Sequence, residues 1–384
     1  MRMSRDPAAR RRLLALAALA LAALVTGAVV GARAGSAPDP PSEPPASVDR
    51  SASSAKRRPQ SERVVGQLLI LRFAGPRAPG YVTRALREGR ATGVVLFSDN
   101  VEGPAQLRRL TAQLQRAAGG GALVCTDQEG GLVRNVPAAG PQSPQPAQST
   151  HALAAAAASE AARGLRGVGV NVNLAPVADV PSGPASVMSG RAFPGDPTTV
   201  AALVRAAVGG YREGRVAATV KHFPGLGAAG ANTDDAPVTI ASGARELERD
   251  LEPFRAAVSA GVPLVMASHA LYPALDRERI ASQSSRVLTG LLRGRLGFGG
   301  AVMTDSLEAA AVTARSSVEV AAARSVQAGA DLVLMTGQGS YTRVYRHLLR
   351  RAERSAGFRE RVEQAAGRVA RLKRAQSLRA TAGR

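Results

Sequence analysis

Residues 219–237, TVKHFPGLGAAGANTDDAP, combine four charged or titratable side chains with a glycine-rich segment. Within them, residues 225–230 form a literal G-x-G-x-x-G, which cradles a dinucleotide pyrophosphate when it joins a strand to a helix. Here ANTDDAPVTI follows, a segment with the composition of a loop, and no βαβ unit with a ribose-binding acid comes after it. The glycines therefore predict a mobile loop that could swing Asp234 or Asp235 over a ligand.

Polar or charged residues also end almost every apolar run of the chain, where a buried strand would not otherwise carry them. They are Ser98-Asp99-Asn100, Asp127-Gln128-Glu129, Asp179, Lys221-His222, Ser268-His269, Thr304-Asp305 and Thr336. An unpaired carboxylate at the end of an apolar strand is costly to bury, so Asp305 in MTDSL is a candidate for chemistry. Its structural alternative is the N-cap of a helix beginning at SLEAAAV.

The elements that must position these residues are eight short apolar or β-branched runs, separated by Ala-, Leu- and Arg-rich segments of helical character. The runs are 64–73, 93–97, 122–126, 169–177, 217–223, 263–269, 301–305 and 331–336. Apolar strands alternating with helices predict a parallel sheet covered by helices. Eight units fit an α/β fold of the (β/α)8 TIM-barrel type better than the alternative, an open doubly wound sheet. In such a barrel, functional residues lie at the carboxyl ends of the strands.

The chain begins with several arginines, an 18-residue apolar run at 13–30 and a small-x-small pattern, Ala32-Arg33-Ala34. These features predict a signal peptide or signal anchor, with a weak hint of twin-arginine export. A buried helix of the folded domain is disfavoured, because a Pro/Ser-rich stretch follows at once. We therefore expect an exported protein, secreted or membrane-anchored, with three parts: a leader (1–34), a disordered linker (35–62) and a single catalytic domain (63–384).

The net charge of +21 comes almost entirely from arginine, and lysine occurs only at positions 56, 221 and 373. No aromatic residues are interleaved with the arginines, as a single-strand nucleic-acid platform would require. We therefore expect a solvated or anionic-surface-facing charge and no nucleic-acid partner, with a specific polyanion as the alternative. The one cysteine, Cys125, is predicted to be a small buried filler.

Four motifs occur in order along the chain: DQEGG, GRAFPGDP, KHFPG-x-G and GFGGAVMTDSL. Together they resemble the N-terminal domain of glycoside hydrolase family 3, in particular the single-domain β-N-acetylhexosaminidases of bacterial cell-wall recycling. The similarity runs from about residue 64 to residue 339. The resemblance implies retaining hydrolysis of β-linked sugars on a TIM barrel, without a cofactor or metal, by a protein that we expect to be a monomer.

The resemblance also implies roles for individual residues. Asp305 matches the nucleophile, and the positions that bind the glycone match Asp127, Arg191, Lys221 and His222. Arg191 and Lys221 could instead be salt-bridge partners of acids at the barrel top, and His222 could only orient a neighbour. His269 could line the pocket or be a satisfied core histidine.

The sequence departs from the hexosaminidase pattern in the loop after the fifth predicted strand. The acid/base histidine of an Asp-Ser-His triplet is matched by Asp234 of Asn232-Thr233-Asp234, and Leu226 replaces another histidine. An aspartic acid with an ordinary pKa of ~3.9 would need burial or a nearby carboxylate, such as Asp235, to stay protonated. A further sugar-contacting arginine is matched by Asn135, with Arg134 beside it.

These observations predict an exported glycosidase acting on cell-wall or other β-linked sugars. The alternatives are a β-glucosidase or phosphorylase-like member of the family, or a carbohydrate-binding barrel without activity. After Tyr341 the chain is strongly basic, and its apolar spacing predicts amphipathic helices that close the barrel with their arginines outward. Contact of these arginines with an anionic wall polymer or a membrane surface is the alternative.

Overall fold

Eight short parallel strands close into a barrel in the computed structural model, which describes residues 61–337 and 339–381, with side chains to residue 376. The barrel strands are β1 (Leu69–Arg72), β2 (Gly93–Leu96), β3 (Leu123–Thr126), β6 (Val172–Asn173), β7 (Ala217–Phe223), β8 (Leu264–Ala267), β11 (Ala301–Ser306) and β12 (Leu332–Met335). Their spatial order is β1-β12-β11-β8-β7-β6-β3-β2. Because β1 pairs with both β2 and β12, the predicted barrel is confirmed and an open sheet is excluded.

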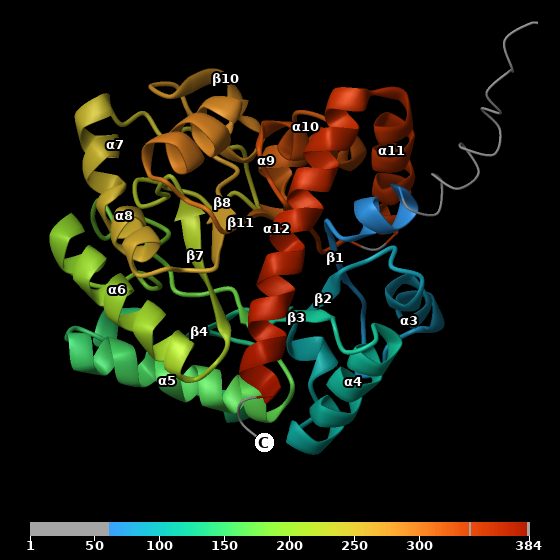
Figure 1. The fold of residues 1–384 in the computed structure, drawn as a ribbon. Helices are drawn as coiled ribbons and strands as arrows, with labels where there is room; N and C mark the ends of the chain where they lie inside the picture. Colours follow the sequence, from blue (N-terminus) through green and yellow to red (C-terminus); the bar gives the residue numbers. More distant parts are fainter. Residues whose placement is uncertain (1–60, 338, 382–384) are drawn as a thin grey trace, which may run out of the picture. The chain divides into compact units, whose positions relative to one another are not determined.

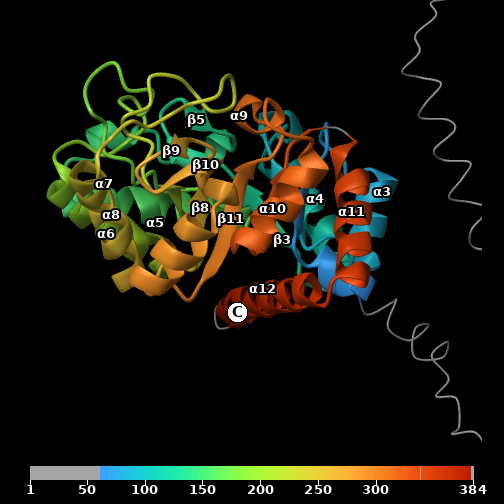
Figure 2. The ribbon, with the colours of Figure 1, turned by 90° about the horizontal axis from the view of Figure 1, so that it is seen from above.

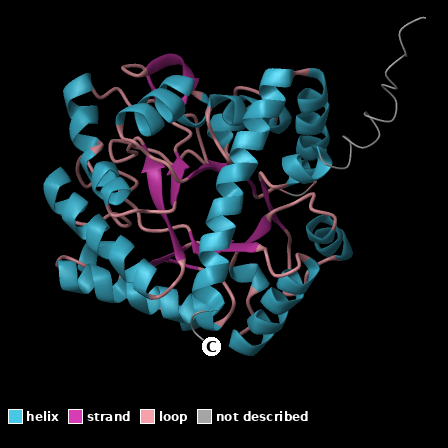
Figure 3. Ribbon diagram, in the orientation of Figure 1, coloured by secondary structure: helices cyan, strands magenta, loops and turns pink. Residues whose placement is uncertain are grey.

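Helices surround the strands, as Figures 1 and 3 show. They are α3 (Gly80–Arg87), α4 (Pro104–Ala117), α5 (His151–Gly167), α6 (Pro197–Glu213), α7 (Ala244–Asp250), α8 (Glu252–Ser259), the π-helical η5 (Arg286–Arg295), α9 (Ala310–Thr313), α10 (Val318–Ala328), α11 (Ser340–Arg354) and α12 (Ala356–Thr381). Two hairpins stand outside the barrel: β4 (Gln128–Gly130) with β5 (Val133–Arg134), and β9 (Leu271–Tyr272) with β10 (Asp276–Ile280).

Two of the barrel strands, β1 and β6, are less than half as long as the apolar runs that predicted them. Residues 61–66 are helical, and the buried Val65 and Leu68 share the i, i+3 spacing of a helix face as well as apolar character. The run at 169–177 contributes only β6 to the barrel, although Val177 still bridges to Lys221. Pro176 explains the early end of this strand, because proline has no N–H for a ladder hydrogen bond.

The inside of the barrel is filled by apolar side chains from its strands, including Ile70, Cys125 and Met303. Cys125 is fully buried, as predicted. Val369 and Leu372 of α12 pack into the same cluster, so this helix closes the barrel at one end. Figure 2 shows α12 on the opposite side of the barrel from β5 and α9. The prediction that the tail closes the barrel is therefore confirmed.

The prediction that the tail arginines all point outward is wrong. Arg361 and Arg368 of α12 reach the fully buried carboxylate of Asp331, at 2.7 and 3.4 Å, and Arg293 of η5 binds it as well. Asp331 also accepts a hydrogen bond from the Val302 N–H at 3.0 Å. A buried carboxylate requires such partners, and here they fasten α12 to the barrel.

In the part of the chain that the structure describes, no helix is both long and apolar enough to cross a membrane. The predicted leader at 1–34 and nearly all of the predicted linker at 35–62 lie outside the described residues.

Candidate active site

A cavity of about 780 Å³ lies at the carboxyl ends of the barrel strands. Its walls contain Asp127, which follows β3, Lys221 and His222 of β7, and Asp305 of β11. The volume is within the usual range for sites that bind small molecules. These four polar side chains from strand ends therefore meet around one hollow, as the barrel requires.

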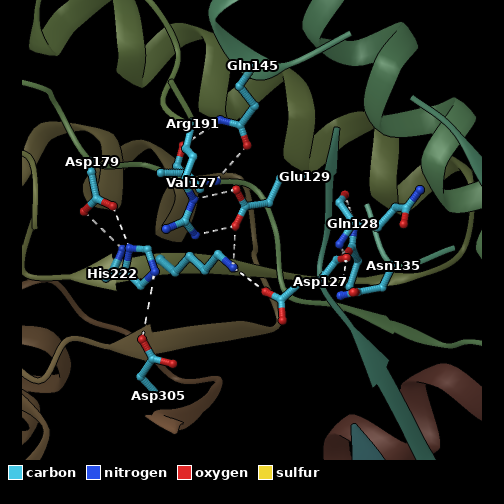
Figure 4. Close-up of polar contacts among 12 residues, drawn as sticks. Asp127, Gln128, Glu129, Asn135, Gln145, Val177, Asp179, Arg191, His222 and Asp305 are labelled. Atoms are coloured by element: carbon cyan, nitrogen blue, oxygen red, sulfur yellow. Dashed lines mark hydrogen bonds and ion pairs between the residues drawn. The ribbon is translucent and has the colours of Figure 1, made fainter. Parts of the chain in front are cut away.

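A chain of alternating charges forms one wall of this cavity (Figure 4). The Lys221 ammonium lies 2.5 Å from Asp127 Oδ1 and 2.7 Å from Glu129 Oε1. Arg191 donates two hydrogen bonds to Glu129, from Nη2 at 2.7 Å and from Nε at 3.0 Å. This fork geometry is the strong form of an arginine–carboxylate pair, and it fixes both side chains.

The pKa values in this chain of charges follow from its pairing. Burial would raise the pKa of Glu129, but Lys221 and Arg191 lower it to about 2. Burial would likewise lower the pKa of Lys221, but Asp127 and Glu129 raise it. Both groups are therefore charged at neutral pH. Arg191 and Lys221 form salt bridges and also line the cavity. Pairing with acids at the barrel top and contact with a ligand, the two interpretations from the sequence, are therefore compatible.

His222 is held from behind by Asp179, which is fully buried. Nδ1 of the ring lies 2.7 Å from Asp179 Oδ2, and the other carboxylate oxygen accepts the N–H groups of His222 and Leu226 at 3.2 and 2.6 Å. Nδ1 carries a proton, because a carboxylate only accepts hydrogen bonds. Nε2 then faces Asp305, at 4.0 Å from its Oδ2.

Asp305 stands near the end of β11, with 21% of its side chain exposed in the cavity. Burial would raise its pKa, but the nearby His222, His269 and Lys221 and the N–H of Ser306 hold the pKa below its ordinary value. The Ser306 N–H donates to Asp305 Oδ1 at 2.8 Å. Asp305 is thus an accessible, ionised carboxylate at neutral pH, as a nucleophile must be.

Asp234 lines the same cavity and keeps contact with solvent. Desolvation by surrounding protein atoms, together with the negative charge of Asp305, raises the pKa of Asp234 above its ordinary value. The carboxylate that acts on it is Asp305, and not Asp235 as the sequence suggested. A raised pKa suits a group that must donate a proton.

The loop that carries Asp234, which the sequence predicts to be mobile, is attached to the following elements by main-chain hydrogen bonds in this structure. The carbonyl groups of Thr233 and Asp234 accept the N–H groups of Ala311 and Ala310, at 3.1 and 3.0 Å. Gly227 serves close packing, since a Cβ there would lie 1.8 Å from the Val180 carbonyl oxygen, whereas a Cβ on Gly230 would meet no atom within 4 Å.

Arg134, the last residue of β5, and Asn135, which follows it, have different hydrogen-bond partners. Arg134 lines the cavity and donates a hydrogen bond to Gln142. Asn135 also borders the cavity, but its amide bonds the Asp127 carbonyl at 3.0 Å and accepts the Ser98 N–H at 3.2 Å. Asn135 therefore braces the end of β3, and Arg134 is the basic group available to a ligand at this wall.

His269 does not reach the cavity, which corrects its assignment as a substrate-binding residue. It is fully buried, with Nδ1 2.7 Å from the Ser282 hydroxyl and Nε2 2.9 Å from the Ser306 carbonyl oxygen. Both ring nitrogens are thus used inside the protein. His269 is the satisfied core histidine of the two alternatives, and it braces the residue after Asp305.

The sequence analysis placed Glu129 and Asp179 at strand ends but assigned no role to either residue. Both follow apolar runs, so their strand-end positions were visible in the sequence. Their roles were not visible, because each acts by pairing with a residue far along the chain. Arg191 is 62 positions from Glu129, and His222 is 43 positions from Asp179.

Chemically, the cavity offers two carboxyl groups of different character beside a set of fixed hydrogen-bonding groups. Asp305 is ionised, and Asp234 is biased toward its protonated form. Among the described residues, no group of three or more His, Cys, Asp or Glu side chains is placed to hold a metal ion. Lys221, Arg191 and Asp127 offer donors and acceptors suited to hydroxyl groups. The arrangement suits acid-assisted nucleophilic substitution on a polyhydroxylated substrate.

Comparisons with known proteins place this geometry among its relatives. The family model described as "Glycosyl hydrolase family 3 N terminal domain" matches residues 62–372. A "Beta-hexosaminidase" of Xanthomonas oryzae pv. oryzae is 34% identical over 282 residues, which are 70% of this chain and 83% of that protein. A "Beta-hexosaminidase" of Nitrosomonas eutropha is 35% identical over 254 residues, 63% of this chain and 73% of that protein.

Solved structures agree with these relatives. A family 3 β-N-acetylglucosaminidase from Paenibacillus sp. FPU-7 superposes with a TM-score of 0.78 at 35% identity, over 82% of this chain and 62% of its own. This chain thus spans less than two thirds of that protein. A β-N-acetylhexosaminidase from Beutenbergia cavernae superposes with a TM-score of 0.74 at 32% identity, over 82% of this chain and 98% of its own.

Proposed function

The chain belongs to glycoside hydrolase family 3, and from this premise we propose that it is an exported, retaining β-N-acetylhexosaminidase-like glycosidase. In this proposal Asp305 is the nucleophile and Asp234 is the general acid/base. One observation carries it: two carboxyl groups line a single cavity, and their surroundings shift their pKa values in opposite directions. Such a pair is what retaining glycoside hydrolysis requires.

The reaction takes two steps on this geometry. An oxygen of Asp305 attacks the anomeric carbon while Asp234 gives its proton to the departing glycosidic oxygen, so a glycosyl ester forms and the alcohol leaves. Asp234, now ionised, then takes a proton from a water molecule that attacks the same carbon. This step breaks the ester, restores the Asp305 carboxylate and releases the sugar with its configuration retained.

The glycone is held by the charged wall of the cavity. Lys221 and Arg191 donate to sugar hydroxyl groups, and Asp127 accepts from them. Because Glu129 binds both cations from behind, their positions are set before a substrate arrives. His222 presents Nε2 between this wall and Asp305, where it can bind a hydroxyl next to the reacting carbon. Arg134 contacts the substrate from the β5 side of the cavity.

The substrate class follows from the relatives and from the leader. The similar proteins named above are hexosaminidases and acetylglucosaminidases, which favours a β-linked N-acetylhexosaminide as the glycone. The arginine-rich start and the apolar run at 13–30 favour export, so we propose an extracytoplasmic substrate such as a cell-wall glycan.

A panel of nitrophenyl glycosides tests the proposal, with the N-acetyl-β-glucosaminide and the β-glucoside as its first members. We expect release of nitrophenol from the N-acetyl-β-glucosaminide, and loss of that release in Asp305→Ala while sugar binding persists. Preference for the β-glucoside would move the protein to the alternative substrate class. Sugar binding without release from any member of the panel would show a carbohydrate-binding barrel and overturn the proposal.

A further inference from the structure

A second cavity, of about 430 Å³, lies at the opposite end of the barrel from the candidate active site. It is bounded by Leu123 and Asn171, at the amino ends of β3 and β6, and by Lys373 and Gln376 of α12. Neither the nucleophile nor any residue proposed above to touch the glycone borders it. Its volume is sufficient for a small molecule.

Lys373 places a cation in this cavity without a counter-ion. Its ammonium donates to the neutral Gln67 Oε1 at 2.9 Å, and no ion pair to Lys373 forms within the described residues. Burial lowers the pKa of Lys373 to about 8. A partly buried ammonium that lacks a carboxylate is costly, so an anion arriving beside it would gain a strong partner.

Gln376 adds a second group that lacks a partner. The residue is 7% exposed, and neither its amide nitrogen nor its amide oxygen has a hydrogen-bond partner among the described residues. The other two amide side chains of the cavity behave differently. Gln115 bonds both the N–H and the carbonyl of Ala122, and Asn171 bonds the Val124 N–H and the Ala122 carbonyl.

The charge of the cavity has one sign. Arg166 and Arg215 border it together with Lys373, whereas no Asp or Glu occurs among the described residues that line it. Buried polar groups are satisfied in the great majority of cases, so an unpaired amide beside an unpaired ammonium points to a missing partner. The partner must carry negative charge, and it must also accept and donate hydrogen bonds.

We propose that this cavity is a binding site for a small anionic molecule, whose phosphate or carboxylate group accepts hydrogen bonds from Lys373 Nζ and the Gln376 amide. The Gln376 carbonyl oxygen accepts from a hydroxyl group of the same ligand. Because Lys373 and Gln376 belong to α12 and the facing wall belongs to the barrel, the ligand bridges the two. Its binding stabilises the fold without requiring contact with the catalytic cavity.

Thermal unfolding of the full chain at constant ionic strength tests the site, with inorganic phosphate and acetate as probes and chloride as the balancing salt. We expect a saturable rise in Tm with at least one probe, and the probe that acts identifies the oxyanion. Lys373→Met should weaken the apparent affinity at least about tenfold, because a charge-assisted hydrogen bond is lost. Gln376→Leu should weaken it by a smaller factor.

Arg371→Met is the matched control, because Arg371 lies on α12 two positions from Lys373 and is exposed. It should respond to the probes like the natural protein. Each variant's Tm without probe shows whether the variant is folded. A Tm response that survives intact in folded Lys373→Met would place the anion elsewhere and overturn the proposal, as would the absence of any response to both probes in the natural protein.

Discussion

Lys221 and Lys373 are both withdrawn from bulk water, at opposite ends of one barrel, yet the barrel shifts their pKa values in opposite directions. Lys221 lies between two carboxylates, and these raise its pKa despite burial. Among the described residues, Lys373 has only the amide oxygen of Gln67 as its hydrogen-bond partner, and burial lowers its pKa to about 8. The comparison teaches that the partners of a buried lysine, more than burial itself, decide the direction of its pKa shift.

The largest expected effect comes from removing the shared partner at the Lys221 end. Glu129→Gln leaves Lys221 and Arg191 without the charge that holds them, so kcat/KM should fall at least about 100-fold through misplacement of sugar-binding groups. The free energy of unfolding should fall by about 3–5 kcal/mol, because a buried pair is broken. Steady-state kinetics and urea unfolding measure the two effects. The exposed Glu102→Gln is the control, and an unchanged kcat/KM in Glu129→Gln would refute the role of this charged wall.

A comparable loss, confined to the chemical step, is expected at the same end for Asp234→Asn. Loss of the general acid should lower kcat about 100- to 1000-fold for a poor leaving group and less for a dinitrophenyl glycoside, which departs without a proton. In the natural protein, kcat should fall as pH rises through the raised pKa of Asp234, and this limb should vanish in the variant. Asp235→Asn should leave both kcat and the pH profile unchanged. Equal losses in the two variants would reject Asp234 as the acid.

The opposite end of the barrel should show an effect on stability alone. Asp331→Asn removes the charge that Arg293, Arg361 and Arg368 share, and should lower the free energy of unfolding by about 2–3 kcal/mol. The kcat/KM of the folded variant should not change. Glu319→Gln, which breaks the more exposed pair with Arg343, should cost under about 1 kcal/mol. A large loss of kcat/KM in folded Asp331→Asn would show that this end of the barrel affects activity as well as stability, and would contradict the comparison.

The smallest expected effect is an increase in the free energy of unfolding. Lys373→Met removes a partly buried ammonium, and at pH 7 it should raise the free energy of unfolding by about 1–2 kcal/mol, a range that allows for partial access to water. The pKa of Lys373 is about 8 in the folded protein against 10.5 for a free lysine. Between these values the unfolded chain binds more protons, so the natural protein gains stability as pH rises and the advantage of the variant shrinks. Urea unfolding from pH 7 to pH 10.5 measures this, with Arg371→Met as the control. A difference that does not change with pH would contradict the assignment.

Much of the fold could be predicted because its signals are local. The apolar runs located all eight barrel strands, and β7 coincides with the predicted 217–223. Boundaries were less accurate where two patterns overlap, as at residues 64–68, whose apolar spacing suits a helix as well as a strand. The inward arginines of α12 could not be read from periodicity, because their partner Asp331 lies 30 positions or more away in the chain.

The candidate site also has features that the sequence predicts and features that only the structure shows. Strand-end positions located Asp127, Lys221 and Asp305 at one cavity, because parallel strands of a barrel all end on the same side. The sequence could not distinguish the roles of His222 and His269, and three-dimensional contacts were needed to do so. His222 faces the cavity, whereas both ring nitrogens of His269 form hydrogen bonds inside the core. Three-dimensional contacts were also needed to show that Gly227, in a segment that looks flexible in sequence, lies too close to the Val180 backbone to carry a side chain.

The tether between the acid-bearing loop and α9 has a consequence for how this site can change over time. It is made by main-chain groups at residues 233, 234, 310 and 311, and the last two of these follow β11, the strand that carries Asp305. The position of residue 234 relative to Asp305 therefore does not depend on which side chain it bears. A codon change there can exchange one titratable side chain for another on an unaltered main chain, so an aspartic acid can stand where the family resemblance leads us to expect a histidine.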